Sequence, residues 1–82
     1  MKITITKKIK QELEVPAYWT NPNSSAVFKL LSYESCMMVI ANERYPSIGY
    51  TSADYNFSET SFEITEQVFN LRLNEAKQYL NL

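Results

Sequence analysis

Cys36 is the only cysteine of the chain, and its thiol is the strongest nucleophile that the sequence offers. Nucleophilic catalysis by cysteine requires a neighbouring base, and the chain contains no histidine. The four residues that follow Cys36 are all apolar. Burial among apolar side chains raises the pKa of a thiol and makes it inert. We therefore expect Cys36 to be a core residue, and a single cysteine can form no internal disulfide.

Oxygen-bearing side chains offer a second chemistry, the binding of calcium. Asp54, Asn56 and Ser58 have the spacing of the first half of a calcium-binding loop. Glu59 stands where that loop requires glycine, and Thr65 stands where it requires a bidentate glutamate. A polar turn is therefore the expected structure, and no metal is expected.

Acid–base catalysis by paired carboxylates has only Glu63 and Glu66 as candidates. Both lie at the expected start of a helix, where acidic residues are favourable for structural reasons. The lack of histidine removes the commonest general base and the commonest metal ligand. The single glycine, Gly49, excludes glycine-rich phosphate-binding motifs. The residue types thus predict a protein that is not an enzyme and that holds no cofactor.

Basic residues near the start of the chain suggest nucleic-acid binding as an alternative function. Lys2, Lys8 and Lys10 share the polar face of the first expected strand, and Trp19 follows shortly after. A basic edge beside an aromatic ring is typical of proteins that bind single strands. Two glutamates share that face, however, and the net charge of the chain is −1. Trp19 can equally cover the core, so nucleic acid is the weaker of the two expected partners.

Aromatic residues are concentrated between residues 45 and 62, where acidic residues separate them. Tyrosine is enriched at protein interfaces because its ring adds contact area and its hydroxyl adds a hydrogen bond. The same rings could instead cover the sheet of a small domain. We expect at least some of them to form a surface that binds another protein or a second copy of the chain. The expected surface consists of Tyr45, Tyr50, Tyr55, Phe57, Arg44 and Asp54.

Short strands must position these candidates, and the clearest strand pattern covers residues 2–15. Five of the seven odd positions are apolar and none of the even positions is, which predicts one strand with a buried face and a wet face. Lys7 and Gln11 interrupt the apolar face, so we expect a bend or bulge there. Pro16 should end the strand.

Three further strands and two connections are expected between residues 20 and 52. Residues 36–41 are apolar on both faces, which is typical of a central strand. Ala53, Tyr55 and Phe57 continue the last strand with the opposite parity, which predicts a bulge near residues 51–52. The expected strands are 27–31, 36–41 and 47–52, and the connections are 20–25 and 42–46.

A single helix is expected over residues 65–80. Thr65 is a favourable N-cap, and a hydrophobic contact between Ile64 and Phe69 is available at the helix start. Apolar residues spaced by four, three and four form one stripe that needs a sheet beneath it. The predicted fold class is therefore α+β, an antiparallel β-meander of about four strands with one C-terminal helix packed on one face. The stripe consists of Phe69, Leu73, Ala76 and Leu80.

The length of 82 residues predicts one domain, residues 1–82. The longest apolar run, Cys36 to Ala41, is too short to span a bilayer, and the first residues lack the apolar segment of a signal peptide. A cytoplasmic location and no membrane partner are therefore expected.

The segment Ile64–Leu80 and the opening Lys-Ile-Thr-Ile-Thr resemble small uncharacterised proteins of phages and mobile elements of gut bacteria. The resemblance rests on a capped helix and an alternating strand, and it brings no activity to any residue. It implies an accessory role, in which the protein binds and modulates a host or phage protein.

Overall fold

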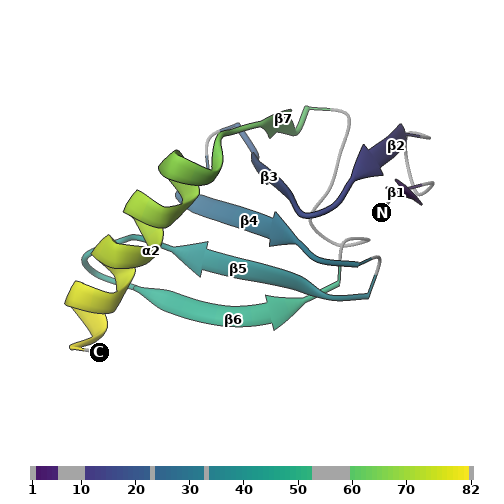
Figure 1. The fold of residues 1–82 in the computed structure, drawn as a ribbon. Helices are drawn as coiled ribbons and strands as arrows, with labels where there is room; N and C mark the ends of the chain where they lie inside the picture. The colour runs from purple at the N-terminus through teal and green to yellow at the C-terminus, as the bar shows by residue number, and fades with distance from the viewer. Residues whose placement is uncertain (1, 6–10, 23, 33, 53–59, 82) are drawn as a thin grey trace.

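Strands dominate the part of the chain that the computed structural model describes, which is residues 2–5, 11–22, 24–32, 34–52 and 60–81. One helix, α2, follows the strands within these residues (Figure 1). The strands are β1 (Lys2–Ile5), β2 (Gln11–Glu14), β3 (Ala17–Thr20), β4 (Ala26–Leu30), β5 (Cys36–Ile40), β6 (Ser47–Thr51) and β7 (Phe62–Glu63), and α2 spans Glu66–Leu80.

Five of the strands form one antiparallel sheet in the order β6-β5-β4-β3-β7. Strands β3 to β6 follow one another as a meander, and β7 returns along the outer side of β3 (Figure 1). Strands β1 and β2 pair with each other in a separate two-stranded ribbon. The predicted α+β class, antiparallel sheet and C-terminal helix are confirmed, although the sheet has five strands where about four were expected.

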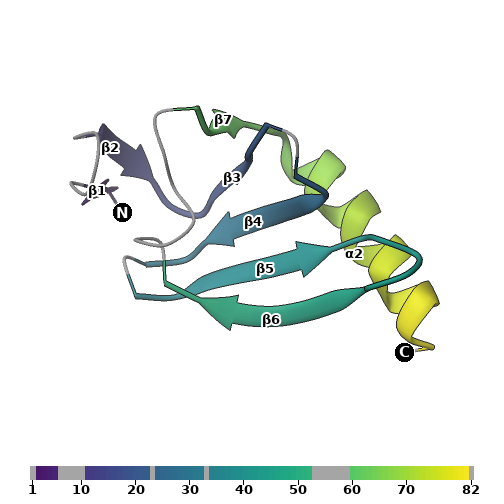
Figure 2. The same cartoon turned by 180° about the vertical axis from the view of Figure 1, so that it is seen from behind.

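Helix α2 packs on one face of this sheet, against β4, β5 and β6. Seen from the opposite side, the helix lies behind the strands (Figure 2). The core on this side contains Val27, Val39, Phe69 and Ala76, with Leu73 partly buried against them. Phe69 is only 1% exposed, which confirms that it is a core residue.

Local sequence explains where α2 begins. The Thr65 side chain accepts a hydrogen bond from the backbone N–H of Val68 at 3.1 Å, which satisfies one of the unpaired amides of the first turn. Ile64 packs against the cluster that contains Phe69, as the expected contact at the helix start requires. The helix ends at Asn81, which adopts the left-handed conformation with φ 61°.

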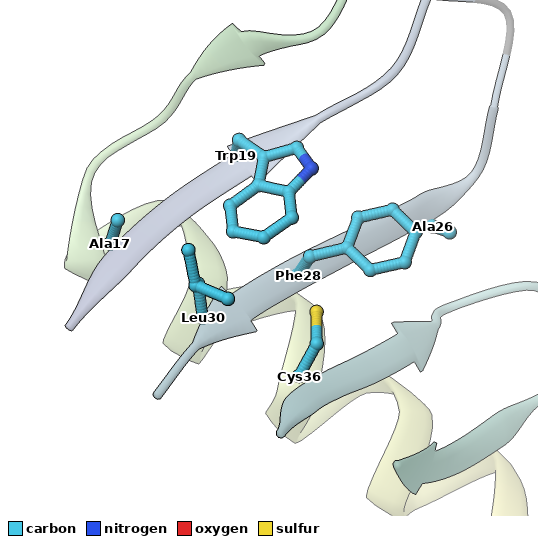
Figure 3. Packing of buried hydrophobic residues seen from close by; sticks show 6 residues of the cluster. All are labelled: Ala17, Trp19, Ala26, Phe28, Leu30 and Cys36. Atoms are coloured by element: carbon cyan, nitrogen blue, oxygen red, sulfur yellow. The ribbon is translucent and has the colours of Figure 1, made fainter. Parts of the chain in front are cut away.

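The opposite face of the sheet carries its own apolar cluster (Figure 3). Trp19 and Phe28 stack there with ring centroids 5.7 Å apart. Both rings are 2% exposed, so most of their area contributes to stability by burial. The full cluster is Ala17, Trp19, Ala26, Phe28, Leu30 and Cys36.

The prediction of one strand over residues 2–15 is wrong, because β1 and β2 are two strands joined as an antiparallel pair. Ile3 lies opposite Leu13 and Ile5 opposite Gln11, so odd residues pair with odd residues. The alternation of apolar and polar residues is therefore the same in a pair of antiparallel strands as in one straight strand. Lys7, where a bend was expected, lies outside the described residues.

Two short strands were not predicted. Strand β3 follows a cis peptide bond between Val15 and Pro16, and β7 is only two residues long. The connection expected at residues 42–46 is confirmed, since the side-chain oxygen of Asn42 accepts a hydrogen bond from Arg44 N at 2.8 Å. The bulge expected near residues 51–52, with Ala53, Tyr55 and Phe57, involves residues beyond the described part of the chain. Among the described residues, no helix is long and apolar enough to cross a membrane.

Candidate functional site

Cys36 lies on β5, on the face of the sheet turned away from α2, and its side chain is fully buried. Leu30 of β4 is its cross-strand neighbour (Figure 3). Burial raises the pKa of the Cys36 thiol to about 12, because the thiolate would lose its hydration. A thiol that stays protonated is a poor nucleophile. The expected burial is confirmed, and the expected lack of reactivity stays a prediction.

Carboxylates do not gather into a metal site within the described residues, where no group of three or more Asp, Glu or Cys residues could hold an ion. Glu63 is exposed on β7, and Glu66 is exposed in the first turn of α2. An acid in the first turn stabilises the helix through its dipole, which gives Glu66 a structural role. The calcium-like residues Asp54, Asn56 and Ser58 lie outside the described residues.

Three residues of the expected partner-binding surface are described, and all three are exposed. Arg44 and Tyr45 lie in the turn that leads into β6, and Tyr45 is 73% exposed. Tyr50 lies on β6 and is 68% exposed. The remaining residues of that surface, Tyr55, Phe57 and Asp54, are among those not described.

Tyr45 lies just before β6 and Tyr50 lies near its far end, so their backbones are up to roughly 17 Å apart at 3.3 Å per residue. The Asn42 side chain fixes the turn at one end by accepting hydrogen bonds from Arg44 N at 2.8 Å and Tyr45 N at 3.4 Å. The described surface is therefore a strip along the outer strand of the sheet.

A row of side chains continues this strip inward across the sheet, on the face that carries α2. The ring of Tyr18 lies 5.4 Å from that of Phe69, and Lys29 Nζ lies 5.7 Å from the centre of the Tyr18 ring. Only the outermost member, Tyr50, is exposed, and the others are half-buried. Apart from Tyr50, the expected surface did not include the residues of this row, although Lys29 is the one charged residue of β4. From β3 to β6, the row is Tyr18, Lys29, Met37 and Tyr50.

The residues expected for nucleic-acid binding are not assembled into a basic surface in the described structure. Trp19 is 2% exposed and stacks on Phe28, so its ring cannot stack on a base. Lys2 is exposed, but it lies directly opposite Glu14 in the pairing of β1 with β2. The acidic neighbour offsets the charge of Lys2. Lys8 and Lys10 lie outside the described residues.

A pocket of about 410 Å³ lies between the β3–β4 connection and the start of α2. Hydroxyl-bearing residues of the connection form one wall, and Phe62 and Val68 contribute apolar surface to the other. Arg72 also lines the pocket, and its guanidinium is paired with Glu75 at 3.1 Å. Sequence patterns do not reveal this pocket, because its walls come from segments about forty residues apart, such as Asn21 and Phe62. A side-chain hydrogen bond between Ser61 and Asn21 joins the two segments.

The mixed lining of this pocket gives it no defined chemistry. Its one cation, Arg72, already forms an exposed ion pair with Glu75, and such pairs contribute little to stability. Two of the polar residues are engaged in holding the β3–β4 connection, since Thr20 Oγ1 donates to Ala26 O at 2.7 Å and Ser24 Oγ accepts from Ala26 N at 3.1 Å. The strip along β6 is therefore the stronger candidate.

Comparison of the chain with protein-family models, with curated proteins and with solved structures gave no match.

Proposed function

We propose that this chain is a non-enzymatic accessory protein that binds another protein through β6 and the tyrosines on and beside it. Modulation of a host or phage factor is the role that such binding would serve. The observation that carries the proposal is Tyr50, a large ring that is 68% exposed on the outermost strand of a sheet. A ring in that place gains contact area only when something covers it.

The surroundings of Tyr50 fit a binding strip. Tyr45 adds a second exposed ring at the other end of β6, and Arg44 beside it adds a charged group at the rim. Aromatic anchors with charged residues at the margin are the usual composition of interface hot spots. The outer edge of β6 also offers backbone groups to an extended partner segment, a common mode of peptide recognition.

Nucleic acid is the less supported partner. The burial of Trp19 removes the ring that was expected to stack on bases. The position of Lys2 opposite Glu14 reduces the attraction of that edge for phosphate. Contacts that survive nuclease treatment would distinguish a protein partner from a nucleic acid.

The test replaces Tyr50 by the photoreactive residue p-benzoylphenylalanine and irradiates the protein in host lysate. We expect defined protein adducts that persist after nuclease treatment. The matched control carries the same residue in place of Leu71, which is 58% exposed on α2. The Leu71 control should give no such adducts, because it lies away from the strip.

A further variant sharpens the comparison. Tyr45→Ala in the Tyr50-labelled protein should reduce the adduct yield, since Tyr45 belongs to the same strip. Equal adducts from the Tyr50 and Leu71 positions would contradict the proposal, because nonspecific contact labels both. Loss of all adducts after nuclease treatment would favour the nucleic-acid alternative.

A further inference from the structure

The two outer edges of the five-stranded sheet differ in a way that points to a partner. Strand β7 forms one edge and consists of two residues, one of which is the charged Glu63. Strand β6 forms the other edge with five residues, none of them charged and none a proline. Natural sheets protect their edges with short strands, charges, prolines or bulges. Edge β7 has two of these protections, and the sequence of β6 has no charge or proline.

No described element covers the outer side of β6. In Figure 1 it is the lowest strand of the sheet, and the described part of the chain pairs it only with β5. Helix α2 contacts β6 from one face of the sheet, with its C-terminal end near the start of β6, and the β1–β2 ribbon lies at the other end of the molecule (Figure 2). Among the described strands, none occupies the outer edge of β6.

We infer that β6 pairs in antiparallel fashion with β6 of a second copy of this chain, about a two-fold axis that passes midway between the two Gly49 residues. The inference rests on the proposed function, whose partner it names. An axis at the middle residue of β6 uses the whole strand, and it places residue i of one copy opposite residue 98 minus i of the other. The two sheets then continue as one, with both α2 helices on the same side.

The side chains of β6 are complementary to themselves under this symmetry. Tyr50 of each copy comes to lie opposite Ile48 of the second copy, and the exposed ring gains a β-branched neighbour. Both residues lie on the face that carries α2, where Ile48 already packs against the helix-side core. The apolar core on that side therefore extends across the axis.

Gly49 suits the axis itself because a Cβ added there meets no atom within 4 Å. Two glycines can face each other across the axis without a steric clash. Strand β6 carries no charged residue, so two copies of it can pair without like-charge repulsion. This favours a second copy as the partner of the edge. A charged peptide would find no complementary charge on this strand.

The test places a charge on the axis. Gly49→Glu and Gly49→Lys each put a side chain into open space in the monomer. In the dimer, each introduced charge would face the identical charge of the second copy. Sedimentation equilibrium should find the wild-type protein dimeric and each variant with a dimer Kd raised about tenfold or more. An equimolar mixture of the two variants should regain dimers, because glutamate then faces lysine.

The controls carry the same charges away from the axis. Asn74→Glu and Asn74→Lys on the exposed surface of α2 should dimerise like the wild type. Circular dichroism and thermal unfolding at low concentration verify that all variants fold. A wild-type protein that is monomeric at millimolar concentration would overturn the inference, and so would Gly49 variants that dimerise normally.

These outcomes separate the inference from the broader proposal. A monomeric wild type that still forms nuclease-resistant adducts at Tyr50 with another protein would reject the dimer and leave the proposed function standing. A dimer disrupted by the Gly49 variants, with adducts formed only between two copies, would support the inference and reject the host or phage factor.

Discussion

At the level of single residues, the environment of Cys36 decides its chemistry. The side chain is fully buried, and the cluster around it is entirely apolar. No charged group that could stabilise a thiolate belongs to that cluster. The residue therefore contributes packing, as a small hydrophobic side chain does.

The first prediction is that Cys36 resists alkylation in the folded protein. Iodoacetamide at pH 7.5 should label it only as fast as the protein opens, because the thiol is both covered and protonated. Mass spectrometry in the absence and presence of denaturant measures the two rates. Stoichiometric labelling within minutes under native conditions would show that β5 is accessible.

The second prediction concerns stability at alkaline pH. The pKa of the Cys36 thiol is about 9 in the unfolded chain and about 12 in the folded protein. The folded state holds this proton more tightly, so the contribution is complete below pH 9 and is lost as the pH rises toward 12. The loss approaches about 4 kcal/mol of unfolding free energy for a shift of this size.

Urea unfolding at pH 8 and pH 11 measures that contribution by comparison with Cys36→Ala. The two proteins differ only at this residue, so the difference between their pH dependences isolates the thiol. The wild type should lose more stability than the variant. Parallel curves would mean that the thiol is not shielded from water.

At the level of elements, α2 is attached to the sheet mainly through Phe69. The third prediction is that Phe69→Ala lowers the unfolding free energy by about 3–5 kcal/mol, the usual cost of removing a buried ring. Leu73→Ala should cost less, because Leu73 is only partly buried. Leu71→Ala is the matched control on the exposed side of the same helix and should change stability by less than about 0.5 kcal/mol. An unchanged melting temperature for Phe69→Ala would contradict the packing of helix on sheet.

The fourth prediction concerns the start of the same helix. Thr65→Ala removes the side-chain oxygen that accepts from Val68 N and should cost about 1 kcal/mol. Thr65→Ser keeps that oxygen and should remain close to the wild type. Equal destabilisation by both substitutions would assign the effect to the lost methyl group instead of the cap.

Elements with strong local signals could be predicted from the sequence, and elements defined by distant partners could not. The helix has a cap and a complete stripe, and β4, β5 and β6 have apolar residues between polar turns. The pattern of residues 2–15 is ambiguous because a reversal that pairs odd with odd positions leaves the alternation intact. Strand β7 depends on pairing with β3, more than forty residues earlier, and two residues carry no periodicity.

The parts of the candidate site with local signals could also be predicted from the sequence, and the parts that depend on distant strands could not. Exposure of Tyr45 and Tyr50 agrees with the predicted surface, because a region so rich in rings exceeds what one strand can bury. The neighbouring row that includes Lys29 required the cross-strand register, which no single segment contains. The sequence allows Trp19 either to stack on a base or to cover the core. Its stacking on Phe28 depends on strand β3, which the sequence does not predict.

At the level of the whole molecule, the proposed dimer would enlarge a small core. A chain of 82 residues buries only roughly 60–65% of the surface of its extended form. The sheet has one protected edge, β7, and one long neutral edge, β6. Joining two copies along β6 would add backbone pairing. It would also extend the apolar face that α2 covers, although the chain itself stays short.

The fifth prediction is that thermal stability depends on protein concentration. If unfolding is coupled to dissociation, each tenfold rise in concentration adds about 1.4 kcal/mol per dimer, and the melting temperature should rise by a few degrees per decade. At concentrations below its raised dimer Kd, Gly49→Glu should melt at a temperature that does not change with concentration, because its charge opposes pairing at the axis. Differential scanning calorimetry over two decades of concentration compares the two proteins, with Asn74→Glu as the charge-matched control. A wild-type melting temperature that stays constant, as for the Gly49 variant, would mean that β6 remains unpaired and that the domain is stable on its own.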